Sequence, residues 1–256
     1  MTTIDQYAYC SPFKDIHPVE KLLFAIASML LVLIFNSYLI SFIAITAMFF
    51  LLVLGAKINY KFYLRLMLIP LAFIFIGCLA VAVNFSSFQQ SFIFSVKIAS
   101  LWVGVSPSSF VAASILFVKS LAAVSCLYFL ALTTPMVQII YILRKLRIPA
   151  VIADLMILVY NSIFVFISTA QDIYVAQISR CGYQGFQGRV RCLAILCSNL
   201  YLKCMQRSDE AYNALLSRGF MGELKVLEEE YKFKAKNLAG IVVFNGVLLF
   251  VYYLGR

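Results

Sequence analysis

The stretch that decides the fold is LLFAIASMLLVLIFNSYLISFIAITAMFFLLVLGA, residues 22–56, which holds 35 residues without one charged side chain. About 17–25 apolar residues cross a bilayer as a helix, so this stretch is long enough for two crossings. NSYLIS (36–41) supplies a turn signal in its middle. We therefore predict two membrane-spanning helices, at 19–35 and 38–56.

The composition of the whole chain is that of a membrane protein. Its 256 residues are 63% hydrophobic and 12% charged, whereas a soluble domain carries about 25% charged residues. The apolar windows 66–83, 109–132 and 238–254 predict three more spans, with a polar stretch (84–97) between the third and fourth. The net charge of +10 indicates basic cytoplasmic loops and contact with anionic lipid.

The segment 149–170 is also apolar, but the placement of charge argues against a crossing. Basic residues follow the second span (57–65) and the fourth (144–147), which puts both groups on the cytoplasmic side. If 149–170 crossed, the ten Lys and Arg residues between 171 and 236 would be translocated. We therefore predict five spans, with residues 134–236 in a cytoplasmic or interfacial region before the last one.

A polar stripe supports this prediction. Asp154, Asn161, Ser168 and Asp172 are spaced 7, 7 and 4 residues apart, which places them along one face of a helix. A lipid-facing span is surrounded by apolar chains and has no reason to carry a polar stripe. A helix that lies at the membrane interface and packs on other helices does.

The region 134–236 divides into three predicted helices, at 135–146, 149–181 and 190–217. Glycines follow the second and third helices, and glycine just beyond a helix end is a common stop signal. The predicted domains are therefore 1–133 with four transmembrane helices, 134–236 with the inserted helices, and 237–256 with the last span.

The two long helices of this region end in similar motifs, AQISRCGYQG (176–185) and ALLSRGFMGE (214–223), whose arginines are 38 residues apart. A cation is favoured at a helix C-terminus, so Arg180 and Arg218 either cap their own helices or face lipid. Alternatively, each tip enters a groove of another protein, and its arginine forms a forked ion pair with a carboxylate. Tyr183 and Phe220 would then be apolar anchors beside the tips, and two tips indicate a partner in two copies.

Several classes of site are not supported by the sequence. It contains no G-x-x-x-x-G-K-[ST] phosphate loop, and its single histidine, His17, is no basis for a metal site or a nucleophile–histidine pair. The seven cysteines form no C-x-x-C pair and are interpreted as small core residues. We expect no catalytic residue, cofactor or metal site on this chain.

The motifs resemble those of the transmembrane T component of energy-coupling-factor (ECF) transporters, of the cobalt type (CbiQ family). The family signature is a pair of Ala-Arg-Gly-like motifs at the tips of two coupling helices, matched here by SRCG (179–182) and SRGF (217–220). ALTTPMVQIIYILRKLRIP (131–149) is similar to the connector of the family, and IDQYAYCSPFKDIHPVEKLL (4–23) to its cobalt-type N-terminus. Ser179 and Ser217 replace the usual alanine, and Cys181 replaces a glycine.

The resemblance implies an all-α membrane protein with five transmembrane helices plus a coupling region inserted before the last span. It implies a non-catalytic subunit of an ATP-driven cobalt importer in a bacterial or archaeal cell membrane. Its partners would be two copies of an ABC-type ATPase subunit and a substrate-binding membrane subunit, the S component. The residues that contact the ATPases would be Ser179, Arg180, Cys181, Gly182, Ser217, Arg218 and Gly219.

Other functions remain open at this point. A T component can serve nickel or a vitamin in place of cobalt, and no residue here selects the ion. An independent secondary carrier or channel would transport without partners, and a membrane anchor would bind ATPases without a moving role. Purification of the chain together with an ATP-binding-cassette protein would separate these alternatives.

Overall fold

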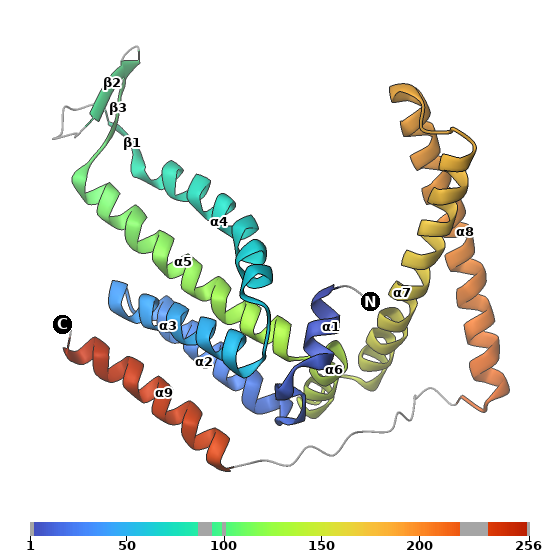
Figure 1. The fold of residues 1–256 in the computed structure, drawn as a ribbon, viewed down its shortest axis with the longest axis horizontal. Coiled ribbons are helices and arrows are strands. Elements are labelled where there is room, and N and C mark those ends of the chain that lie inside the picture. Colours follow the sequence, from blue (N-terminus) through green and yellow to red (C-terminus); the bar gives the residue numbers. More distant parts are fainter. Residues whose placement is uncertain (1–2, 87–93, 99–100, 221–234, 255–256) are drawn as a thin grey trace. The chain divides into compact units, whose positions relative to one another are not determined.

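The computed structural model describes residues 3–86, 94–98, 101–220 and 235–254 (Figure 1). The helices and strands in these ranges follow one another in the order α1 (Thr3–Cys10), η1 (Pro12–Asp15), α2 (Pro18–Ile34), α3 (Tyr38–Phe50), η2 (Leu51–Gly55), α4 (Tyr60–Ala82), β1 (Val83–Ser86), β2 (Phe94–Ile98), β3 (Leu101–Val105), α5 (Pro107–Thr133), α6 (Met136–Lys145), α7 (Ala150–Ser179), α8 (Gly185–Ser217) and α9 (Ala235–Leu254).

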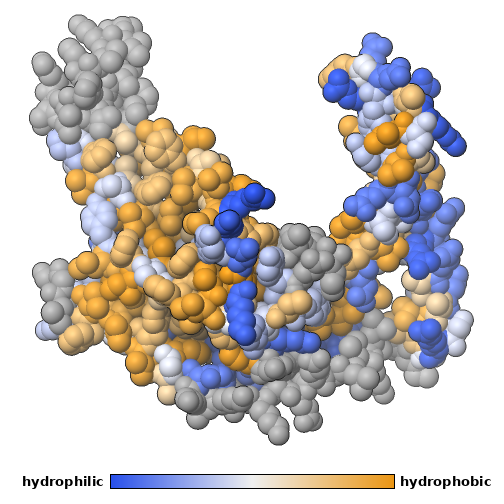
Figure 2. Space-filling view, viewed as in Figure 1, coloured by the Kyte–Doolittle hydropathy of each residue, from blue (hydrophilic) through white to orange (hydrophobic). Residues whose placement is uncertain are grey.

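The chain forms two compact units. The membrane unit contains Thr2–Pro135 and Glu230–Arg256, and the hairpin unit contains Met136–Glu229. In the membrane unit, α2, α3, α4, α5 and α9 match the five predicted spans, and α3 continues through the π-helical turn η2. The predicted all-α membrane fold is confirmed. Figure 2 shows that hydrophobic residues dominate the visible surface over α3, α4 and α5.

Within the described residues, four helices are long and apolar enough to cross a membrane: Tyr38–Gly55, Tyr60–Ala82, Pro107–Thr133 and Ala150–Ser179. Asn237–Tyr253 is a shorter apolar helix. The helix Ala150–Ser179 is α7, which contains the segment predicted to stay outside the bilayer. Length and composition allow α7 to cross the membrane. The prediction that it lies outside the bilayer therefore rests on the charge distribution and stays a prediction.

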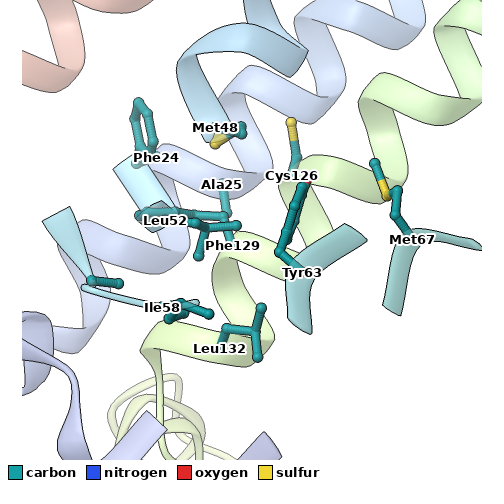
Figure 3. Close-up of a cluster of buried hydrophobic side chains, with 11 residues drawn as sticks. Phe24, Ala25, Met48, Leu52, Ile58, Tyr63, Met67, Cys126, Phe129 and Leu132 are labelled. Carbon is teal, nitrogen blue, oxygen red and sulfur yellow. The ribbon is translucent and has the colours of Figure 1, made fainter. Parts of the chain in front are cut away.

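The core of the membrane unit joins α2, α3, η2, α4 and α5. Phe24 of α2 packs edge-on against Phe129 of α5 and tilted against Phe244 of α9, with ring centroids 5.3 Å apart in both pairs. Met48 and Leu52 are fully buried beside them (Figure 3). Side chains from helices far apart in the sequence therefore fill one interior, as the long apolar runs predict.

Charged side chains at the start of α2 are buried with polar partners. The Nζ atom of Lys21 donates to the carbonyl oxygens of Phe13 (3.0 Å) and Thr133 (3.1 Å), which lies in the last turn of α5. The Nδ2 atom of Asn237 in α9 donates to Glu20 Oε2 at 3.0 Å. These bonds satisfy charges that would be costly in an apolar interior.

Pro70 lies well inside α4, because α4 begins at Tyr60 rather than at the predicted residue 66. A proline has no N–H, so the carbonyl oxygen of Leu66 loses the donor that a regular helix provides. The hydroxyl of Tyr128 in α5 donates to this oxygen at 3.1 Å. A neighbouring helix thus satisfies the backbone group that the proline leaves free, as a membrane interior requires.

Lys119 is a charged residue in the middle of α5, one of the predicted spans. Its Nζ atom donates to Asn36 Oδ1 at 2.8 Å, in the turn between α2 and α3. The ammonium is therefore directed to the polar connection between two other spans, which lowers the cost of placing it among apolar residues.

A small antiparallel sheet joins α4 to α5, in the order β1-β3-β2. Val83 pairs with Val105 at one end of β3, and Ile98 pairs with Leu101 at the other. The strands are rich in β-branched and aromatic residues, which favour extended backbone. This sheet is an addition to the predicted fold, where the segment is only a polar connection.

The hairpin unit contains the three predicted helices of the inserted region, as α6, α7 and α8. The prediction that the third begins near residue 190 is wrong, because α8 begins at Gly185. Gly188 serves close packing rather than a loop, since a Cβ atom there would lie 3.0 Å from the carbonyl oxygen of Gly182. The glycines at 182, 185 and 188 suggest a longer loop between the two helices. The sequence does not reveal that Gly188 packs against the Gly182 carbonyl.

Candidate functional site

The second tip, residues 217–220, ends α8 with a Schellman motif. The N–H of Gly219 donates to the Leu216 carbonyl at 3.0 Å, and the N–H of Phe220 donates to the Leu215 carbonyl at 3.1 Å. Gly219 has a φ of 77°, in the left-handed region that glycine enters without steric cost. Arg218 is therefore the last residue before the chain turns away from the helix.

The first tip, residues 179–183, ends α7 with the same hydrogen bonds. The N–H of Cys181 donates to the Ile178 carbonyl at 2.8 Å, and the N–H of Gly182 donates to the Gln177 carbonyl at 3.0 Å. Cys181 has a φ of 55° and so holds the left-handed position that Gly219 holds in the second tip. The cysteine adopts this angle at a cost of roughly 1–2 kcal/mol for an L-residue.

The serines before the two arginines also correspond. Ser179 Oγ donates to the Val175 carbonyl at 3.0 Å, and Ser217 Oγ donates to the Asn213 carbonyl at 2.9 Å. Each hydroxyl thus bonds to its own helix four residues back. The two tips therefore match in their helix-end hydrogen bonds, their left-handed residue and their serine contact.

Arg180 and Arg218 are both exposed at the helix C-termini. In the described part of the chain, neither guanidinium makes a hydrogen bond or an ion pair. Their side chains do not bond to the last carbonyls of their own helices. Each can meet an anionic group outside this chain without breaking a contact among the described residues.

Tyr183 is turned onto its own hairpin. Its hydroxyl donates to Gln177 Oε1 at 2.7 Å, and its ring meets that of Tyr174 edge-on at 5.1 Å. Desolvation, and then the proximity of Cys192 and Tyr174, raises the pKa of the Tyr183 hydroxyl. An exposed aromatic residue beside the first tip is Phe186, which is 79% exposed and which the two sequence motifs do not indicate.

Cys192 of α8 packs against the first tip and is hydrogen-bonded to it. Its Sγ atom donates to the Gly182 carbonyl at 3.1 Å, and Gln177 Nε2 donates to the Cys192 carbonyl at 3.1 Å. A Cβ atom on Gly182 would lie only 2.6 Å from Cys192 Sγ. Gly182 is therefore required for the close approach of α7 and α8, rather than for its backbone angle.

Between the tips, α7 and α8 form an open groove of about 630 Å³. Apolar residues line much of it, among them Leu158, Val159, Met205 and Tyr212. None of the residues of α8, all of which the structure describes, is buried. The helix consequently exposes Leu193, Tyr201, Leu202 and Leu216, and exposed apolar surface of this kind marks contact with another protein or with a membrane.

Other candidate groups have local roles. His17 is buried, and its Nδ1 atom accepts from the Val19 N–H at 3.2 Å, which caps α2. The four residues of the predicted polar stripe have different surroundings: Asp154 is buried, Asn161 lines the groove, and Ser168 and Asp172 are exposed. Among the described residues, no three His, Cys, Asp or Glu side chains are grouped as metal ligands.

The comparison with protein-family models decides the relationship. The model of the CbiQ family, described as cobalt transport protein, matches residues 11–228. The chain belongs to this family. Like other CbiQ-family proteins it is a transport component, and it is a multi-pass protein of the cell membrane.

Individual relatives agree with this membership. An uncharacterized protein of Methanocaldococcus jannaschii is 27% identical over 99% of this chain and 93% of its own length. A protein of Methanocorpusculum labreanum, named as a fused cobalt transport protein CbiMQ, is 31% identical over 89% of this chain and 38% of its own length. The cobalt transport protein CbiQ of Salmonella typhimurium is 25% identical over 87% of this chain and 99% of its own length.

Proposed function

We propose that this chain is the transmembrane coupling subunit of an ECF-type importer for cobalt. In this function it holds two copies of an ABC-type ATPase subunit through its two tips. It transmits their ATP-driven motion to a substrate-binding membrane subunit. ATP binding and hydrolysis occur on the ATPase subunits.

The observation that carries the proposal is the equivalence of the two tips. The same helix-end hydrogen bonds, left-handed residue, serine contact and exposed arginine occur at the ends of both α7 and α8. Two equal docking structures fit a partner that is present in two equal copies.

The spacing of the tips fits the same partner. The first tip directly precedes α8 and the second follows it, so the 33 residues of α8 separate them. At about 1.5 Å per residue this is roughly 50 Å, a distance on the scale of a small domain or more. Because one continuous helix separates the two tips, they would move as one body with the ATPase subunits that they hold.

The arginines supply the recognition. A guanidinium makes two parallel hydrogen bonds with a carboxylate, so an acidic groove on each ATPase subunit is the expected receptor. Arg180 and Arg218 are exposed and have no partner in the described chain, so binding would cost no internal ion pair. Phe186 beside the first tip and Phe220 in the second add apolar contact.

A second membrane subunit is supported by the groove and by a relative. The groove between α7 and α8 and the uncovered apolar residues of α8 offer a surface for a further protein. In the fused protein CbiMQ, the part similar to this chain accounts for 38% of the length and is joined to a further part. We infer that this chain likewise works beside a separate subunit that captures the ion.

The family supports cobalt as the substrate. The family description and the names of two relatives refer to cobalt transport. In the described residues, the chain has no grouped metal ligands of its own, which fits a division of labour in which another subunit binds Co²⁺.

The test is purification of the complex from cells that express all subunits, with a tag on this chain. We expect the Arg180→Ala/Arg218→Ala double variant to lose the ATPase subunits and ATP-dependent Co²⁺ uptake. Lys203→Ala is the control, because this exposed cation of α8 lies outside both tips and does not line the groove. Full assembly and uptake in the double variant would refute the proposal.

A further inference from the structure

A third Schellman motif joins α6 to α7 in the hairpin unit. The N–H of Arg147 donates to the Arg144 carbonyl at 3.0 Å, and the N–H of Ile148 donates to the Leu143 carbonyl at 3.4 Å. Arg147 has a φ of 62°, and Pro149 then begins α7. We call residues 146–149 the elbow. These two bonds fix the end of α6, and on the other side of the elbow the Pro149 carbonyl accepts from the Ile152 N–H in the first turn of α7 at 3.0 Å.

A side-chain ion pair spans the elbow. Arg144 in the last turn of α6 donates from Nη2 to Oδ1 of Asp154, ten residues later in α7. The side chains are 23% and 7% exposed, so the pair is largely removed from water. A buried carboxylate needs its cation, because an unpaired buried charge is strongly unfavourable. Asp154 therefore holds α7 against α6.

We propose that Arg144 and Asp154 are positioning residues that set the angle between α6 and α7 and so transmit the movement of the first tip toward the membrane. This inference rests on the proposed function. The 30 residues of α7 separate the elbow from the first tip, which makes the helix a lever of about 45 Å. A stiff joint between α6 and α7 would pass a movement of α7 on to α6, whereas a loose joint would absorb it.

The location of the pair distinguishes this role from simple stabilisation. An exposed pair in the hairpin unit, Arg207 with Glu210, lies within one helix and joins no two elements. Arg144 and Asp154 instead join two helices, and α6 directly follows the membrane unit in the sequence. Loss of the pair should leave both tips intact, so the ATPases would still bind while their motion was absorbed at the elbow.

The functional test uses the full complex in proteoliposomes and measures Co²⁺ transported for each ATP hydrolysed. We expect Asp154→Asn to retain the ATPase subunits and ATP hydrolysis but to lose most Co²⁺ uptake. The charge exchange Arg144→Asp/Asp154→Arg should recover uptake in part. The control Asp172→Asn removes an exposed carboxylate from the same helix and should leave the ratio unchanged. An unchanged ratio in Asp154→Asn would overturn the inference, as would a loss of assembly and hydrolysis together with uptake.

A second measurement needs no partner subunit. Spin labels replace Val137 in α6 and Val159 in α7, which are 48% and 56% exposed, in the full chain with its native cysteines replaced. We expect Asp154→Asn to broaden the distance distribution between the labels and Asp172→Asn to leave it narrow. A distance distribution in Asp154→Asn as narrow as that of the chain with Asp154 would overturn the elbow inference and leave the proposed function untouched. If wild-type protein bound no ATPase, the proposed function would fail while this distance measurement would still report on the elbow.

Discussion

Replacement of Cys181 by glycine should stabilise the first tip. Cys181 has a φ of 55°, where an L-residue is less favourable than glycine by about 1–2 kcal/mol. Glycine also has more freedom in the unfolded chain, which offsets about 0.5–1 kcal/mol of this gain. The cysteine side chain is exposed, so its loss removes little packing. We expect a net local stabilisation of about 0.5–1 kcal/mol.

Hydrogen exchange measures this effect directly. The amides of residue 181 and Gly182 donate to the Ile178 and Gln177 carbonyls, and their exchange requires the motif to open. A gain of about 0.5–1 kcal/mol slows exchange about two- to fivefold, since 1.4 kcal/mol corresponds to a factor of ten. Gly219→Ala is the opposite substitution in the second tip. It places an L-residue at a φ of 77° and should speed exchange of the Phe220 amide. Unchanged or faster exchange in Cys181→Gly would refute the equivalence of the two tips.

Three further predictions concern packing and topology. Gly182→Ala should loosen the first tip, because the new methyl group would lie 2.6 Å from Cys192 Sγ, and Cys192→Ala should restore exchange protection in the double variant. Tyr128→Phe should destabilise the membrane unit by about 1–3 kcal/mol in unfolding assays, because it leaves the Leu66 carbonyl without a donor; a change near zero would contradict this. Cys197, as the only cysteine retained, should react with an impermeant maleimide only after permeabilisation, and labelling in intact cells would contradict a cytoplasmic hairpin unit.

Much of the fold follows from the sequence because the bilayer restricts it. Long uncharged runs have to form helices, and the observed spans begin and end within a few residues of the predicted ones, except at α4. There the uncharged window begins at residue 66, whereas the helix begins at Tyr60 and so contains Pro70 in its interior. The hydroxyl of Tyr128 makes the interior position acceptable. No local pattern reveals this, since the two residues lie in different helices.

For the candidate site, the sequence likewise predicts local features but not contacts between helices. The Ser-Arg motifs are local signals, and both lie at helix ends as expected. The inward turn of Tyr183, the exposure of Phe186 and the contact of Gly182 with Cys192 depend on how α7 packs against α8. The pair of Arg144 with Asp154 likewise depends on the elbow. The polar stripe identified Asp154 but could not indicate its partner.

Photo-crosslinking from the two tips tests the central claim most directly. A benzophenone amino acid replaces Phe186 beside the first tip or Leu216 beside the second, which are 79% and 48% exposed. The control is Tyr201, which is 59% exposed in the middle of α8. We predict that both tip positions crosslink to the same ATPase polypeptide in cells and that position 201 does not. Crosslinks from the tips to lipid alone, or to no ATPase, would contradict the account.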